Sequence, residues 1–195
     1  SQISNTAFFH EGFSSTSTLP AADLLFSGNF IQDVGNGMVL RRLATADISG
    51  NQILSVIDNG LEITESGSVE IIDNEFNKWG MSSQTGSTGL AGVRASDITD
   101  LKLNDNGFSS YYIGKYPDYR TIGIDITESI GEIMNNSFSN VDVGAMFRGN
   151  NNFENAFSEN VFEGDQVHGL YLNFKTRIRR QECQRNKWIG NFASD

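Results

Sequence analysis

The sequence predicts an all-β fold in which short strands coil into one solenoid. Three observations lead to this prediction: an asparagine recurs in a fixed apolar setting, a glycine recurs at a steady offset after it, and apolar residues alternate with polar ones. Twenty glycines against two prolines favour short strands joined by tight turns. A chain of 195 residues is long enough to bury a core as a single domain, 1–195.

The first repeated element has the pattern apolar-x-x-Asn-x-apolar, as in Ile71, Asn74 and Phe76 of the stretch VEIIDNEFNKWG. Successive copies of its asparagine are 22 to 32 residues apart. The copies occur at Asn29, Asn51, Asn74, Asn106, Asn136, Asn160 and Asn186. Self-similarity at such a period indicates a stack of structural repeats.

The second element, Gly-apolar-x-apolar, follows the first at a steady distance. Its glycines are Gly37, Gly60, Gly92, Gly123, Gly144 and Gly169. Within each repeat the apolar residues alternate with polar ones, as at Ile124 and Ile126, which is the pattern of a half-buried strand. Strands this short suit a coil whose successive turns pair in parallel, roughly 4.7–4.9 Å apart.

The two elements, in this order and spacing, resemble the rungs of the right-handed parallel β-helix, the pectate-lyase-like fold. The resemblance runs from about Asn5 to Trp188 and implies about seven to eight rungs of 22–32 residues. It implies that the repeated asparagines point inward at a bend, and we expect the asparagine itself to take the left-handed conformation there. Because the amide both donates and accepts, stacked copies should bond along the axis.

Two consecutive rungs are longer than the others, within residues 78–91 and 109–122. Both insertions fall at the same corner, so we expect them to emerge side by side. In the resembled fold, loops at this corner form the walls of a groove in which substrate binds. Exposed loops on a rigid scaffold are also where binding residues concentrate.

These two loops hold the candidate ligand-binding residues: Trp79, Tyr111, Tyr112, Lys115, Tyr116, Tyr119 and Arg120. Aromatic rings with a polar group can stack on sugar faces, and cationic side chains can meet a carboxylated or sulfated glycan. The alternative is that the rings only cover the outside of the coil.

The outward positions of the glycine-containing strands place Glu62, Arg94 and Asp125 in one column. If the protein is an enzyme, its catalytic residues would be Asp125, Glu62, Arg94 and Tyr116. The alternative is a structural ladder of charges. A second column interleaves charges in the same way on another face, where no long loop overhangs it: Asp47, Glu70, Lys102 and Glu132.

Composition limits the partners and cofactors. A formal net charge of −10 argues against nucleic-acid binding, and no apolar run approaches the roughly 20 residues of a membrane span. No cofactor or metal motif is present, although residues 97–107 are acidic enough to hold a surface calcium ion if they do not simply form a solvated turn. Residues 175–187 carry six of the fourteen basic residues, which suits either a solvated face or docking to an anionic partner or neighbouring copy.

Two functions remain open, because the β-helix carries lyases, hydrolases, epimerases, phage spikes and adhesins alike. The first is an extracellular or cell-surface module that binds glycan or packs into a surface or fibre assembly, without catalysis. The second is a polysaccharide lyase, epimerase or glycoside hydrolase acting in the groove beside the two long loops. Both ends of the repeat lack a cap, so we expect either a fragment of a longer chain or a subunit covered by its neighbours.

Overall fold

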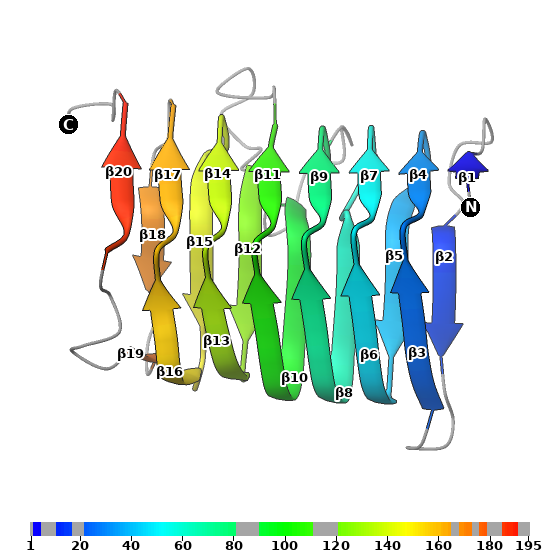
Figure 1. Cartoon of the computed structure of the whole chain (residues 1–195), viewed down its shortest axis with the longest axis horizontal. Helices are drawn as coiled ribbons and strands as arrows, with labels where there is room; N and C mark the ends of the chain where they lie inside the picture. The colour runs from blue at the N-terminus through cyan, green and yellow to red at the C-terminus, as the bar shows by residue number, and fades with distance from the viewer. Residues whose placement is uncertain are drawn as a thin grey trace.

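The chain forms a right-handed parallel β-helix. The computed structural model describes residues 2–4, 11–16, 22–80, 90–110, 121–164, 168–172, 176–178 and 185–190. In Figure 1 the chain advances from right to left, rises along the strands nearer the viewer and descends along those behind them, which is a right-handed coil. All pairings between the described strands are parallel, because each strand lies beside its equivalent in the next rung.

Eight strands of three residues each stack into one sheet. In order, they are β1 (Gln2–Ser4), β4 (Phe30–Gln32), β7 (Gln52–Leu54), β9 (Glu75–Asn77), β11 (Gly107–Ser109), β14 (Ser137–Ser139), β17 (Val161–Glu163) and β20 (Lys187–Ile189). The central residue of each strand from β4 to β17 points into the core, which explains why an apolar residue recurs two positions after each asparagine.

The second sheet bends at the corner of each rung, so it has one part made of descending strands and another made of ascending strands. Its descending strands are β2 (Glu11–Thr16), β5 (Asn36–Arg41), the first half of β8 (Leu61–Ile72), the first half of β10 (Leu90–Asn104), β12 (Thr121–Thr127), β15 (Val143–Arg148) and β18 (His168–Leu172). Its ascending strands are β3 (Ala22–Ser27), β6 (Leu43–Ser49), the second halves of β8 and β10, β13 (Ile130–Met134), β16 (Asn152–Ser158) and β19 (Arg177–Ile178).

The predicted asparagine ladder is confirmed. The backbone N–H and the side-chain amide of Asn74 both donate to Oδ1 of Asn106, at 2.9 and 3.0 Å. Asn106 donates in the same way to Asn136, and the pattern holds from Asn29 to Asn186. The side-chain amide of Asn106 also donates to the Ile71 and Asn104 carbonyls, so buried backbone groups inside the bend gain partners.

The expectation that asparagine takes the left-handed conformation was wrong by one position. The residue before each ladder asparagine has a positive φ, as at Asp73 with φ 57° and Asp105 with φ 58°. The full set is Gly28, Gly50, Asp73, Asp105, Asn135, Glu159 and Arg185. This residue turns the chain while its side chain faces solvent at Asp73, and the asparagine that follows is thereby directed inward.

The two repeated elements pack on each other in the core. A ladder of parallel rings runs through Phe76, Phe108, Phe138, Phe162 and Trp188, with centroids 4.9 to 5.5 Å apart. Each repeated glycine lies against the central residue of the short strand in the following rung. A Cβ on Gly123 would be 2.4 Å from the Phe138 ring and 2.5 Å from the Gly144 carbonyl oxygen. Glycine recurs here because no side chain fits.

A second line of buried polar side chains supports the corner between descending and ascending strands. Ser129 donates its backbone N–H to Asn151 Oδ1 at 2.9 Å, and its hydroxyl accepts from the Ile98 N–H at 3.2 Å. Ser66 accepts from the Leu43 N–H in the same way. The sequence does not predict this ladder, because its residue type changes from rung to rung.

Candidate binding face on the descending strands

The predicted charge column exists on the outer face of the descending strands. Strand register aligns Val39 with Glu62, Glu62 with Arg94, and Arg94 with Asp125. It continues from Asp125 through Met146 to Tyr171. The alternation of apolar and polar residues at a period of two therefore predicted the column correctly. The ion-pair partners of its residues differ from the prediction.

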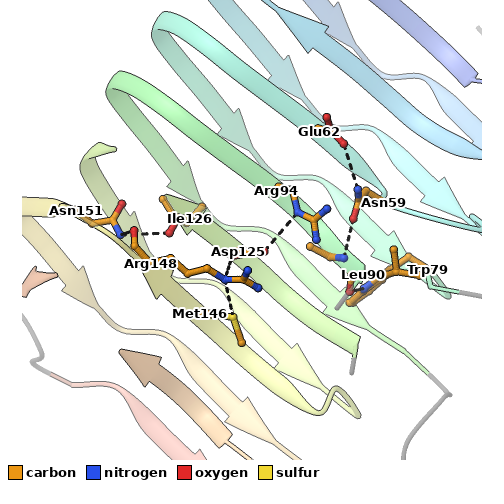
Figure 2. Close-up of polar contacts among 11 residues, drawn as sticks. Asn59, Glu62, Trp79, Leu90, Arg94, Asp125, Ile126, Met146, Arg148 and Asn151 are labelled. Atoms are coloured by element: carbon orange, nitrogen blue, oxygen red, sulfur yellow. Dashed lines mark hydrogen bonds and ion pairs between the residues drawn. The ribbon is translucent and has the colours of Figure 1, made fainter. Parts of the chain in front are cut away.

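Asp125 is the centre of this column, and it lies between two arginines. Its Oδ2 is 3.4 Å from Nε of Arg94, and its Oδ1 is 3.1 Å from Nε of Arg148 (Figure 2). Asp125 is 3% exposed, whereas the side chains of Arg94 and Arg148 are 27% and 29% exposed. The carboxylate is thus an inner counter-ion, and the two arginine side chains are the more exposed members of the group.

The contact between Asp125 and Arg148 is electrostatic without hydrogen-bond geometry at Oδ1. The single hydrogen on Arg148 Nε instead points to Met146 Sδ, 3.1 Å away. A buried carboxylate oxygen with no hydrogen bond is costly, and the two cations offset part of that cost. Arg148 was not among the predicted residues, because it lies one strand further along the chain and two positions beyond the column.

Burial raises the pKa of the Asp125 carboxyl above its ordinary value, while Arg148 and Arg94 pull it in the opposite direction. Burial also raises the pKa of Asp58, and the negative charge of Glu62 adds to that effect. Asp58 precedes β8, the strand that carries Glu62.

Glu62 forms an ion pair with Arg41, on the N-terminal side of the column, at 3.3 Å. Its other oxygen accepts a hydrogen bond from the Asn59 side-chain amide at 3.3 Å. Asn59 Oδ1 in turn accepts from the Ala91 N–H at 2.9 Å, which fixes the start of β10 (Figure 2). Arg41 and Asn59 were also missed, because neither occupies the outward position of the repeated pattern.

A small apolar cluster, separate from the main core, lies next to the charged residues. It consists of Ala91, Ile122, Val143 and Met146, each at most 7% exposed. Register pairs Ala91 with Ile122 and Ile122 with Val143, so three of the four form a row across neighbouring strands. This buried row forms an apolar boundary on one side of Arg94 and Arg148.

Two rings extend the face at its C-terminal side. Tyr171 is 39% exposed and follows Met146 in the column, and the His168 ring is 5.7 Å from it. The prediction named the column position of Tyr171 without assigning it a role. An exposed aromatic ring beside two partly exposed arginines is a combination that can meet both the flat face and the charge of a sugar.

Trp79 does not lie on this face as the prediction required. It is 1% exposed, its indole N–H donates to the Leu90 carbonyl at 3.1 Å, and its ring packs edge-on against Phe108. Trp79 therefore belongs to the core in this structure and offers no ring to a ligand. A residue at the beginning of a long connection can still point inward, which sequence periodicity did not reveal.

The other predicted loop residues lie outside the described part of the chain: Tyr111, Tyr112, Lys115, Tyr116, Tyr119 and Arg120. The residues that flank the two long connections are described. Phe76 pairs with Phe108 before them, and Leu90 pairs with Thr121 after them. The two connections therefore leave the coil after the neighbouring strands β9 and β11 and rejoin it at the start of the neighbouring strands β10 and β12.

The second charge column lies on the ascending strands as predicted. Register aligns Asp47, Glu70, Lys102 and Glu132, and Lys102 Nζ is 2.6 Å from Glu70. The hydrogen bond to Glu70 raises the pKa of Lys102. Lys102 lies on a different face from Arg94 and can therefore serve as a control cation for it.

An open depression of about 610 Å³ lies away from both columns, at the corner between descending and ascending strands. Arg42, Glu65 and Asp97 are among its lining residues, and Arg42 and Glu65 are joined by a 2.7 Å ion pair. It contains none of the predicted ligand-binding or catalytic residues. In the described part of the chain, no three His, Cys, Asp or Glu side chains are grouped to hold a metal ion.

Comparison with known proteins supplies no argument about the function of this chain. No family model matches the chain, and neither does any curated protein sequence. A search of solved structures found the enzymatically active domain of tailspike protein 2 from bacteriophage CBA120, with 16% identity and a TM-score of 0.30. The match covers 89% of this chain, which spans 25% of that one. The candidate site is therefore defined by this chain's own residues.

No helix within the described ranges has the length and apolarity to cross a membrane.

Proposed function

We propose that the protein is a glycan-binding β-helix module, located outside the cell or at its surface, that binds without catalysis. Its ligand would be a carboxylated or sulfated glycan lying across the outer face of the descending strands. The observation that carries the proposal is the arrangement at Asp125: the carboxylate is buried, and the two arginines that hold it keep more than a quarter of their side-chain surface in solvent.

The same arrangement argues against acid–base catalysis by the column. A general acid or base must reach the proton that it transfers, and Asp125 is 3% exposed. Glu62 is engaged by Arg41 and Asn59. The two carboxylates that the sequence offered for catalysis thus serve to position cations and a strand end. The partly exposed groups that remain on the face are cationic and aromatic, which is the chemistry of recognition.

We infer that the predicted loop residues would extend this surface. The connections at 81–89 and 111–120 precede β10 and β12, the strands that carry Arg94 and Asp125. Four tyrosines, Lys115 and Arg120 fall in the second connection. If these rings and cations lie next to Arg94 and Arg148, they would lengthen the binding face so that it contacts more units of a bound polymer.

A glycan array that includes uronic-acid and sulfated polymers tests the proposal. We expect binding to anionic glycans, and no new reducing ends or unsaturated uronates when the bound polymers are incubated with the protein. Binding should fall for Arg94→Gln and Arg148→Gln and persist for Lys102→Gln, the matched cation on the other face. Turnover abolished by Tyr116→Phe would favour the enzyme instead, and a blank array would overturn glycan binding.

A further inference from the structure

Arg94 and Arg148 converge on one buried carboxylate from the strands on either side of it (Figure 2). Their Nε atoms lie 3.4 and 3.1 Å from the two oxygens of Asp125, which is 3% exposed. A dissolved anion therefore meets the arginine side chains before it meets the carboxylate. Guanidinium groups present planar sets of donors, so two that converge in this way can share a single anionic group of a ligand.

The negative charge of Asp125 is only partly compensated by its neighbours. Its Oδ1 is buried and has no hydrogen-bond partner, because the hydrogen on Arg148 Nε points to Met146 Sδ. Burial disfavours the ionised form of an acid, and it raises the pKa of Asp125 although both arginines oppose the shift. A further negative charge close by would therefore favour the protonated carboxyl.

The charged groups next to Asp125 come from the two strands that pair with β12. Strand β10 contributes Arg94, and β15 contributes Arg148. The residue of β15 that is in register with Asp125, Met146, has no charge. Within the described residues, both neighbours that contact the carboxylate are thus the cations that a bound anion would also contact.

Three other titratable groups on or near this face are further from Asp125. Glu62, on β8, lies two strands away and pairs with Arg41, and Asp58 precedes that strand. His168, on β18, lies two strands away in the other direction and is exposed. Histidine ordinarily changes its charge near neutral pH, so its contribution has to be separated from that of Asp125 by substitution.

We propose that one anionic group of the ligand binds Arg94 and Arg148 together, and that Asp125 takes up a proton when it binds. This inference rests on the proposed function and names the group that regulates it. The ligand brings a like charge close to the carboxylate and competes for the same two cations, which favours the neutral acid. The proton comes from the buffer and forms an O–H bond on the carboxyl group.

The coupling is reciprocal, so protonation of Asp125 also strengthens binding. Affinity should rise as the pH falls through the pKa that Asp125 has in the complex. It should level off below the pKa that Asp125 has in the free protein. Between these two values, one proton taken up per ligand changes the affinity by up to about tenfold per pH unit.

Calorimetric titration with dextran sulfate oligosaccharides tests the proposal, because their sulfate esters stay ionised and they carry no carboxylate of their own. Titrations in two buffers of different ionisation enthalpy give the number of protons taken up per bound ligand. We expect net uptake and an affinity that rises as the pH falls. Carbon-detected NMR of the unmodified protein should show a higher pKa for Asp125 with the ligand than without it.

Asp125→Asn is the decisive variant, because it keeps the size of the side chain and one oxygen for the arginines but has no charge. We expect it to bind the probe at least about tenfold more tightly at neutral pH, since the competing anion is gone. It should also lose the proton uptake. His168→Gln and Asp58→Asn are the matched controls, and both should keep the uptake.

Binding without proton uptake, or uptake that survives in Asp125→Asn, would overturn this inference and leave glycan binding in place. Weaker binding by Asp125→Asn would also overturn it, because the carboxylate would then assist the ligand instead of competing with it. An unchanged pKa of Asp125 in the complex contradicts it without any variant. If dextran sulfate does not bind but uronate polymers on the array do, this inference fails alone. If no anionic glycan binds, the proposed function fails with it.

Discussion

Asp125 lies between Arg94 and Arg148, with its Oδ2 3.4 Å from Nε of the first and its Oδ1 3.1 Å from Nε of the second. Three neighbouring descending strands, β10, β12 and β15, supply the three side chains, and their parallel register brings them together. The buried acid fixes the directions of two cations that reach solvent. Stability and binding on this face should therefore both depend on it.

Replacing Asp125 with alanine should lower the free energy of unfolding by about 1–3 kcal/mol, less than the ~3–5 kcal/mol of a fully buried pair because both arginines keep contact with water. Two like charges would be left facing each other without the anion. Asp47→Ala, at an exposed position in the other column, is the matched control and should cost far less. Chemical denaturation followed by circular dichroism measures both. Equal costs for the two variants would show that Asp125 does not hold the pair.

The pH dependence of Asp125 follows from its raised pKa. The folded state binds this proton more tightly than the unfolded state. The carboxyl therefore favours folding below its unfolded pKa, and this contribution is lost as the pH rises through the folded pKa. Glu65 should behave oppositely, because its hydrogen bond and charge interaction with Arg42 lower its pKa. Its contribution is present above the unfolded pKa and is lost as the pH falls through the folded one.

Carbon-detected NMR titration of the two side chains measures these pKa values directly. We expect Asp125 to titrate above the ordinary aspartate value and Glu65 below the ordinary glutamate value. An Asp125 midpoint below the ordinary value would mean that the two arginines outweigh burial at this position.

Asn106→Ala should lower the free energy of unfolding by about 1–3 kcal/mol, because it leaves buried groups without hydrogen-bond partners. Asn106 Oδ1 accepts two hydrogens from Asn74, and its side-chain amide donates to the Ile71 and Asn104 carbonyls. Asn77→Ala, outside the ladder, serves as the comparison. Thermal unfolding of the two variants gives the difference, and an unchanged midpoint for Asn106→Ala would contradict the role of the ladder.

Gly123→Ala should destabilise the coil by about 1–3 kcal/mol, the usual cost of overpacking a core. The added methyl would collide with the Phe138 ring at 2.4 Å and with the Gly144 carbonyl oxygen at 2.5 Å. Gly107→Ala provides the control, because the nearest atom to its added Cβ is the Ser137 hydroxyl oxygen at 3.9 Å. Equal stability of the two alanine variants, measured by urea denaturation, would count against the glycine–ring packing.

The sequence was sufficient to predict the coil because every rung repeats the same solution to the same packing problem. The asparagine at 106 and the glycine at 123 recur because a bend needs an internal hydrogen-bonding side chain and a ring needs room. The bend itself shows the limit of the pattern. Its left-handed residue is a glycine, an acid, an asparagine or an arginine in different rungs, so nothing in the sequence identifies it.

The candidate site was only half predictable for the same reason. Alternation at a period of two placed Glu62, Arg94 and Asp125 in one column. It could not find Arg148, whose long side chain reaches back across the strand, or show that Trp79 turns into the core. Side-chain direction at a corner depends on local backbone angles, which a repeat pattern does not encode.

The most direct test of the proposed function compares Arg148→Gln with Lys102→Gln in calorimetric titrations of the best anionic glycan from the array. We expect Arg148→Gln to weaken binding by about tenfold or more, because it removes one charge-assisted contact, at about 1.5–3 kcal/mol. Lys102→Gln should leave the affinity unchanged. Equal affinities for the two variants and the unmodified protein would contradict binding on the descending face.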